Sequence, residues 1–325
     1  MRQPDLHTLV PLSISWRGEI GSEVFQQMDT FAKTDSLQIE KTIFPKSKGS
    51  FKLYGLIGLF LIITAELLLL LKVKPVMIFF TPLVWTGYIL FVDNLILKLQ
   101  GESLIYNRRK EFFLMLPISV ALWLIFEFYN IFLDNWHYIN LPEKMWIRLI
   151  GFTWSFATIW PAILETAELF RVLHIFDKIK ISGKSISPKI LRASLGCGFV
   201  FLIIPIAFPS RYLAVLVWLG FVLFLDPINY FFRTKSLFRD LEKGKLNILL
   251  SLLLSGLTCG LLWEFWNYWA QSKWIYTVPI LENIKIFEMP VVGYLGFLPF
   301  AVECYVMYNS IGLMLKYRTT RDNIT

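Results

Sequence analysis

The sequence predicts an all-α polytopic membrane protein, with about eight transmembrane helices arranged as two parallel four-helix repeats. Three observations predict this class. Of the 325 residues, 56% are hydrophobic and only 17% are charged, whereas soluble domains carry about 25% charged residues. The apolar residues form long uninterrupted runs, and polar residues recur at matched positions in the two halves of the chain. This composition excludes a soluble globular enzyme.

Apolar runs long enough to cross a bilayer, which takes about 20 residues, begin at Phe51. The breaks between them contain Lys, Arg, Pro and Gly. We place the spans at 51–72, 75–97, 111–133, 146–171, 190–209, 212–232, 246–268 and 288–315. Residues 1–50 have an ordinary soluble composition without the apolar core of a signal peptide. We expect them to form a soluble or membrane-surface segment with one amphipathic helix near Glu23–Phe31.

Basic residues orient these spans. With the N-terminus in the cytoplasm, most Lys and Arg residues fall in cytoplasmic loops, as the positive-inside rule requires. We therefore expect a protein integral to the cytoplasmic (inner or plasma) membrane, with both termini cytoplasmic. The net charge of +8 then serves orientation and contact with anionic lipid, and we expect no nucleic-acid partner.

Four sequence patterns recur at an offset of 133 to 138 residues, and they involve Asp, Glu, Asn, Trp and Pro rather than common apolar residues. The matched pairs are Trp85–Asp93 with Trp218–Asp226, Glu127–Asn130 with Glu264–Asn267, Trp136–Tyr138 with Trp274–Tyr276, and Pro161–Glu165 with Pro299–Glu303. We expect one repeat over 51–180 and the other over 181–325. An even number of spans per repeat predicts a pseudo-twofold axis along the membrane normal, with any site between the halves.

Acidic residues inside the spans are the candidate catalytic groups. An ionisable side chain in hydrocarbon costs about 2.5–3.5 kcal/mol on insertion scales, so such residues mark functional sites. Basic partners are nearly absent from the spans, and we therefore expect protonated carboxyls that donate or relay protons. The candidates are Glu127, Glu165, Glu264 and Glu303. The alternative is that these groups only hydrogen-bond neighbouring helices.

A second set of residues accompanies the glutamates in the repeated motifs. The candidate substrate-binding residues are Asn130, Asn267, Asp93, Asp226, Trp136 and Trp274. The two aspartates lie toward the ends of their spans, where a helix-end role is the alternative. The two tryptophans, with Tyr138 and Tyr276, equally suit an aromatic belt at the membrane interface.

Metal and cofactor motifs are absent from the sequence. The three cysteines lie in apolar stretches without paired spacing, and the three histidines are far apart. There is no Asp-rich diphosphate motif, Gly-rich phosphate loop, HExxH or GxSxG. We expect no metal and no cofactor.

The stretch from Trp274-Ile-Tyr276 to Pro299-Phe-Ala-Val-Glu303 resembles the lycopene cyclase domain of heterodimeric and fungal carotenoid cyclases. That family shows an Asp, a Trp-x-aromatic motif and a Pro-x-Glu-Glu-type motif, and Asp226, Trp274 and Glu303 match best. The chain departs from the pattern where Cys304 follows Glu303. The resemblance implies cofactor-free acid–base chemistry on a long isoprenoid, in which a carboxylic acid protonates an alkene.

Three functions follow as hypotheses. The first is an enzyme, such as a cyclase or isomerase, or a binding protein for an isoprenoid or membrane lipid. The second is a proton- or cation-coupled transporter or channel built from parallel repeats. The third is a structural membrane subunit. The sequence leaves the substrate and the oligomeric state open.

Overall fold

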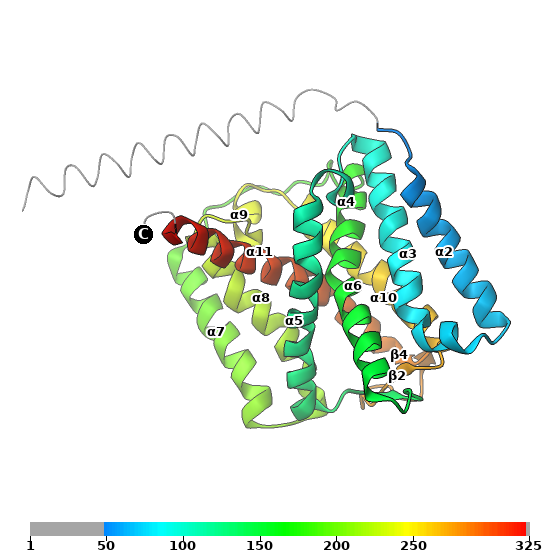
Figure 1. Cartoon of the computed structure of the whole chain (residues 1–325). Helices are drawn as coiled ribbons and strands as arrows, with labels where there is room; N and C mark the ends of the chain where they lie inside the picture. The colour runs from blue at the N-terminus through cyan, green and yellow to red at the C-terminus, as the bar shows by residue number, and fades with distance from the viewer. Residues whose placement is uncertain (1–48, 323–325) are drawn as a thin grey trace, which may run out of the picture. The chain divides into compact units, whose positions relative to one another are not determined.

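The computed structural model describes residues 49–322 and is mostly helical over that range, with very little strand (Figure 1). Within these residues, eight helices are long and apolar enough to cross a membrane. The predicted all-α polytopic class is confirmed, and the protein is an integral membrane protein. The segment expected over 1–50, with its amphipathic helix, lies outside the described residues except for the last two.

The order of the elements repeats along the chain. The first half comprises α2 (Leu53–Leu70), α3 (Lys74–Gln100), α4 (Leu104–Asn107), α5 (Arg109–Leu133), β1 (Trp136–Ile139) and α6 (Met145–Val172). The second half comprises α7 (Pro188–Ala207), η1 (Arg211–Leu213), α8 (Ala214–Phe231), α9 (Leu237–Glu242), α10 (Asn247–Trp269), β2 (Lys273–Tyr276), β3 (Lys285–Ile286), β4 (Met289–Pro290), η2 (Val291–Gly296) and α11 (Phe297–Asp322). The boundary predicted after residue 180 falls in the connection between α6 and α7.

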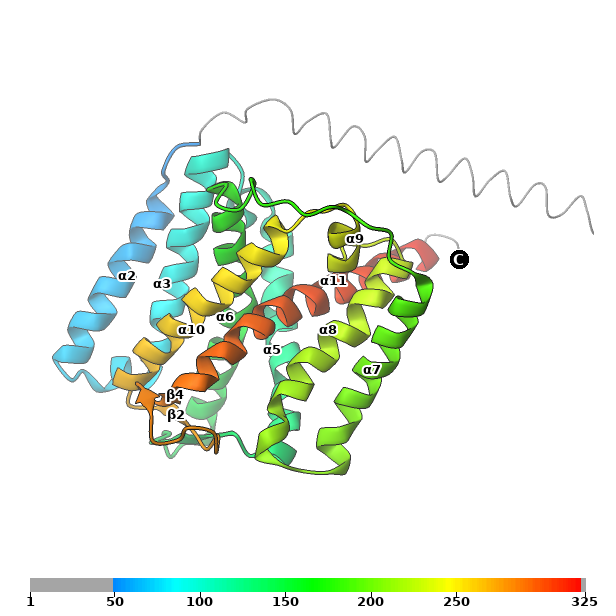
Figure 2. The ribbon, with the colours of Figure 1, turned by 180° about the vertical axis from the view of Figure 1, so that it is seen from behind.

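The helices of the two repeats pack in equivalent ways. In each repeat the first two helices form a hairpin, α2 against α3 and α7 against α8, and these hairpins lie at opposite edges of the bundle (Figures 1 and 2). Only 17% of the apolar window of α2 and 22% of that of α7 are buried, compared with 44% for α10 and 50% for α11. The later helices α6, α10 and α11 form the centre of the interface between the repeats, and α3 and α5 add contacts to α10 and α7.

Both hairpins close on glycine. A Cβ atom on Gly58 of α2 would lie 2.6 Å from the carbonyl oxygen of Gly87 on α3, and one on Gly198 of α7 would lie 2.8 Å from that of Gly220 on α8. Helices in lipid associate through such close backbone approach, because burial of apolar surface gives no driving force there. The matched contacts indicate that both repeats use the same hairpin packing.

The two ends of the bundle differ. The strands and the connections 134–144 and 270–290 lie at one end, which we call the strand end. The connections 101–108, 173–187 and 232–246 lie at the other, which we call the basic end because it is rich in Lys and Arg. Figure 1 shows β2 and β4 at the strand end, with α4 and α9 at the basic end.

The glycine contacts predict a stability difference between two positions on α7. Gly198→Ala places a methyl group against the α8 backbone and should lower the free energy of unfolding by about 1–3 kcal/mol. Gly196→Ala is the matched control, because a methyl group there would have no heavy atom within 4 Å. That variant should be neutral or stabilised by up to about 1 kcal/mol. Thermal unfolding of both in detergent checks this, and equal stability would contradict the proposed packing.

Candidate functional site

Strands β1 and β2, one from each repeat, pair antiparallel at the strand end. Trp136 lies opposite Tyr276, and Tyr138 lies opposite Trp274. Each pair therefore joins the first aromatic residue of one repeat to the second of the other, the reciprocal contact that a twofold axis produces. Because alternate side chains of a strand share a face, these four aromatic side chains project from one side of the strand pair.

Two asparagines hold the strand backbones. In the first repeat, Asn130 Nδ2 donates to Trp136 O at 2.8 Å, and Trp136 N donates to Asn130 Oδ1 at 3.3 Å. In the second, Asn267 Nδ2 donates to Trp274 O at 2.8 Å, and Trp274 N donates to Asn267 Oδ1 at 3.0 Å. Both side-chain amides hydrogen-bond the strand backbones, so these two asparagines, which were predicted to bind substrate, hold the strands that carry the aromatic side chains.

Glu127 and Glu264 accept hydrogen bonds from the aromatic side chains of their own repeat. The Tyr138 hydroxyl donates to Glu127 Oε1 at 2.5 Å, and the Tyr276 hydroxyl donates to Glu264 Oε1 at 2.8 Å. Glu127 also accepts from Trp123 Nε1 at 2.8 Å. The structure thus places one carboxyl behind each strand, joined to a tyrosine hydroxyl.

The two tyrosines sit outside the spanning helices and are half-buried. Burial and then the neighbouring Glu127 carboxyl raise the pKa of Tyr138 well above its ordinary value. Burial and Glu264 act in the same way on the pKa of Tyr276. Both hydroxyls therefore keep their protons at neutral pH and act as donors to the carboxyls.

A cavity of about 180 Å³ lies beneath the four strand aromatics. Residues of both repeats line it, and nearly half of them are aromatic. The aromatic lining residues are Phe79, Trp85, Trp123, Phe126, Trp136, Tyr138, Phe152, Phe156, Trp218, Trp263, Trp274, Tyr276, Phe297 and Phe300. Trp136 and Trp274, which the sequence analysis assigned either to substrate binding or to an aromatic belt at the membrane interface, therefore lie in the wall of a cavity.

Ring contacts across the repeat interface form the deep wall. Phe300 of α11 lies with its ring centroid 5.7 Å from that of Phe126, 6.0 Å from Trp123 and 6.2 Å from Trp160. Trp85 of α3 contacts Trp263 of α10 at 4.9 Å. Aromatic pairs at such separations contribute about 0.5–1.5 kcal/mol beyond their burial, so this wall also holds the repeats together.

A kink in α3 makes room for the cavity. Phe79 has non-helical backbone angles, and Pro82 inside the helix lacks the N–H that would reach the preceding turn. The Thr86 hydroxyl donates to Pro82 O at 2.7 Å and accepts from Trp154 Nε1 at 2.9 Å. Both Phe79 and Pro82 line the cavity.

Glu165 and Glu303, the other two predicted catalytic residues, do not line the aromatic cavity. Glu303 is fully buried, and neither of its carboxyl oxygens has a hydrogen-bond partner among the described residues. Glu165 is 4% exposed, and its Oε2 likewise has no partner among residues 49–322. The structure therefore brings only Glu127 and Glu264 to the strand end and leaves the other two elsewhere in the interface.

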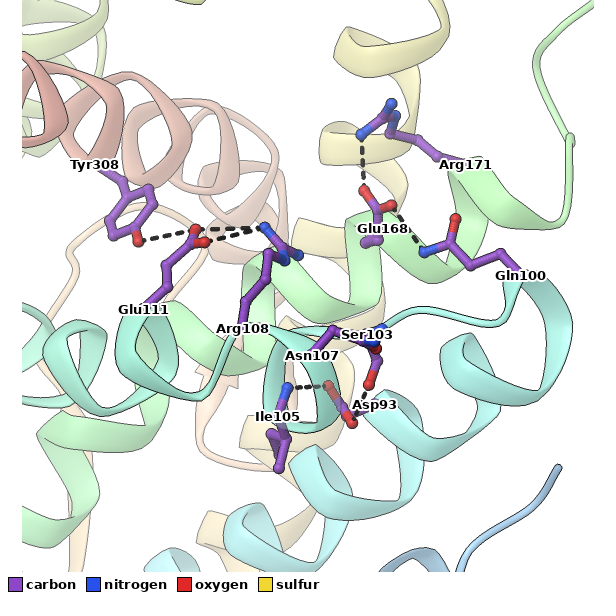
Figure 3. A network of polar contacts seen from close by, with 10 residues as sticks. All are labelled: Asp93, Gln100, Ser103, Ile105, Asn107, Arg108, Glu111, Glu168, Arg171 and Tyr308. Carbon is purple, nitrogen blue, oxygen red and sulfur yellow. Dashed lines mark hydrogen bonds and ion pairs between the residues drawn. The ribbon is translucent and has the colours of Figure 1, made fainter. Parts of the chain in front are cut away.

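Asp93 and Asp226, also predicted to bind substrate, hold the short helices of the basic end, and Figure 3 shows the contacts of Asp93. Asp93 accepts from Ser103 Oγ at 2.8 Å and from Ile105 N at 2.7 Å. Asp226 accepts from Ser236 Oγ at 3.0 Å and from the backbone N–H groups of Leu237 and Phe238. These bonds satisfy the first N–H groups of α4 and α9. The two aspartates thus have the helix-end role that the sequence analysis gave as the alternative to substrate binding.

A second cavity, of about 110 Å³, lies near the basic end and has both charged and apolar lining residues. Its charged lining residues are Arg108, Glu111, Glu165, Glu168, Arg171 and Lys235. Arg108 pairs with Glu111 at 3.2 Å, and Arg171 pairs with Glu168 at 2.7 Å, as Figure 3 shows. Both pairs are partly exposed and add little stability.

The part of the repeat interface that lies between the two cavities is closely packed. Trp160 Nε1 on α6 donates to Cys304 O on α11 at 2.9 Å, and Ser255 Oγ on α10 donates to Ile163 O at 2.6 Å. Trp160 and Ile163 are fully buried. No described residue lines both cavities.

Known proteins supply no further information on the site, because no protein-family model, curated protein or solved structure matches the chain. Among the described residues, no group of three or more His, Cys, Asp or Glu side chains is arranged to hold a metal ion.

Several cavity residues carry no distinguishing signal in the sequence. Trp123 lies outside the repeated motifs, and Phe300 lies inside one but is matched by Ala162 rather than by an aromatic residue. Aromatic residues in a span are otherwise indistinguishable from lipid-facing ones. Trp85 and Trp218 did recur as a matched pair, and that recurrence was the available signal for them.

The asparagine contacts predict faster backbone exchange in the strands. Asn130→Ala should expose the Trp136 amide, and Asn267→Ala should expose the Trp274 amide. Loss of one such bond, worth about 1 kcal/mol, raises local hydrogen exchange roughly fivefold. Hydrogen–deuterium exchange of peptides covering 136–139 and 273–276 measures the effect. Asn309→Ala at the basic end, where Asn309 donates to Tyr305 O, should leave both strands unchanged; unchanged exchange in the first two variants would refute the assigned role.

Proposed function

We propose that the protein binds a long hydrophobic molecule, an isoprenoid or a lipid chain, in the aromatic cavity between its repeats. The observation that carries this proposal is the direction of the polar hydrogens in the cavity wall. Tyr138 and Tyr276 donate to Glu127 and Glu264, which are not themselves lining residues. These two tyrosines therefore offer their ring faces rather than their hydroxyl hydrogens to a ligand, and nearly half of the lining residues are aromatic, as in apolar ligand sites.

The same arrangement supports acid–base chemistry as the form of catalysis, if the bound molecule is converted. Tyr138–Glu127 and Tyr276–Glu264 are acid pairs beside the cavity, one from each repeat. A proton passed from one pair to an alkene would leave a carbocation, which the ring faces of Trp123 and Phe300 would stabilise. Loss of a proton from that cation to a carboxylate of these pairs would then form the product alkene and restore the acid. This cyclase or isomerase activity, consistent with the resemblance to lycopene cyclase domains, would proceed without a cofactor.

A proton- or cation-coupled transporter is the second candidate. One observation favours it: Glu165 and Glu303 are buried carboxyls with unpartnered oxygens in the described structure, and such groups mark proton paths. The packed layer around Trp160 and Ile163 argues for separate cavities rather than a continuous path. We therefore rank binding or conversion of a hydrophobic molecule above transport.

The basic end is proposed to face the cytoplasm. Two of its connections, 173–187 and 232–246, contain clustered Lys and Arg residues, and a third cluster, 108–110, lies where the connection 101–108 meets α5. Such clusters remain on the cytoplasmic side of bacterial and plasma membranes. The strand end and the aromatic cavity would then lie in the outer half of the membrane.

Filling the cavity should abolish ligand binding. Gly151 lines the cavity, and a Cβ atom there would make an ordinary contact of 3.6 Å with the Phe79 ring. Gly151→Leu should therefore fold while occupying ligand space, and weaken binding of radiolabelled geranylgeraniol about tenfold or more. Equilibrium binding to protein in nanodiscs measures this.

Gly196→Leu on the exposed face of α7 is the matched control and should bind geranylgeraniol like the wild type. Equal binding by wild type and Gly151→Leu would contradict the cavity site. Proton flux into liposomes that Glu303→Gln abolishes, with no geranylgeraniol binding, would favour the transporter instead.

A further inference from the structure

Arg148 is the cationic residue in the wall of the aromatic cavity that has no carboxylate partner. It lies in the first turn of α6 at the strand end and is half-buried. Its Nε donates to the carbonyl oxygen of Pro142, another lining residue. Within residues 49–322 no Asp or Glu lies at ion-pair distance from it.

Lys273, the second cationic residue of this wall, is neutralised by a carboxylate. Lys273 pairs with Glu288, and both side chains are largely buried, at 17% and 20% exposed. A partly buried charge is normally paired, because its removal from water is costly. The unpaired guanidinium of Arg148 therefore points to an anion that arrives with a ligand.

The hydrogen bond to Pro142 leaves the two terminal nitrogens of Arg148 available. Fixing Nε orients the planar guanidinium, and its remaining N–H groups match the two oxygens of a carboxylate or a phosphate. A lysine at this position would offer a point charge without that fork.

The start of α6 adds a second positive element beside Arg148. Lys144 precedes the helix without a side-chain cap hydrogen bond, and the first turn contains no acidic residue. Glu143 precedes Lys144 and is exposed, so within the helix itself the partial positive charge of the N-terminus meets no carboxylate in the first turn, and it favours an anion at the same place.

The cavity is elongated away from this charge. Its lining residues on α6 run from Ile147 and Arg148 to Ile159, which is about 18 Å along a helix axis. Beyond Arg148 the lining is dominated by the aromatic residues named above, with Phe300 in the deep wall. A cationic group at one end and an apolar channel beyond it fit an amphiphile.

We propose that the ligand is a long-chain anion whose carboxylate or phosphate head binds Arg148 and whose apolar chain extends along α6 toward Phe300. This inference rests on the proposed function, since it specifies the class of molecule that occupies the same cavity. It predicts that a free alcohol of equal chain length is the poorer ligand.

The test compares three twenty-carbon probes: geranylgeraniol, geranylgeranyl phosphate and eicosanoic acid. Binding to the full-length protein in nanodiscs of neutral lipid is measured for the wild type and two variants. The wild type should bind at least one of the anions about ten- to a hundredfold more tightly than the alcohol, as expected for a charge-assisted hydrogen bond. Binding of only one anion identifies its head group, phosphate or carboxylate.

Arg148→Gln keeps an N–H for Pro142 and removes the charge, so it should lose the preference for anions while still binding geranylgeraniol. Lys144→Gln is the matched control, because Lys144 is exposed at the same helix end but is not a lining residue, and it should keep the preference. Equal affinity of the wild type for alcohol and anions, or a preference that survives Arg148→Gln, would overturn the head-group site and leave the cavity proposal standing. Failure of all three probes to bind the wild type would overturn both.

Discussion

The antiparallel pairing of β1 with β2 is the interaction on which the rest of the strand end depends. Extended backbone near hydrocarbon must have its N–H and C=O groups satisfied by protein, and neither repeat achieves this alone. Each strand satisfies its partner from the other repeat on one edge, while Asn130 or Asn267 of its own repeat satisfies it on the other. The pairing thereby fixes the two repeats about their pseudo-twofold axis.

The same pairing determines the chemistry of the cavity. It places four aromatic side chains on one face, and Glu127 and Glu264 accept hydrogen bonds from the two tyrosine hydroxyls. The symmetry ends at the cavity wall. Trp123 corresponds by the repeat offset to Gly260, and Arg148 corresponds to Ile286. A duplicated scaffold thus supports a single asymmetric cavity with a charged end.

Much of the fold was predictable because it follows from composition and recurrence. Apolar run length indicated the eight spans, and the matched Asp, Glu, Asn and Trp residues indicated the two parallel repeats. The site was predictable only in part. The recurrence selected Glu127, Glu165, Glu264 and Glu303 as equivalent candidates, and only Glu127 and Glu264 lie beside the strand tyrosines. The sequence does not show how deep a residue lies within a span or which face of a helix meets the repeat interface. The aromatic wall and the place of Arg148 in it could therefore be recognised only in the structure.

The register of the strand pair tests the central claim most directly. His137 lies opposite Ile275, and facing residues of an antiparallel pair have Cα atoms about 4.5–5.5 Å apart, within the range of a disulfide. With the exposed Cys197 replaced by Ala, His137→Cys with Ile275→Cys should crosslink on mild oxidation, and His137→Cys with Lys273→Cys should crosslink far less. Preferential crosslinking of the second pair, or none in the first, would contradict the account of how the repeats meet.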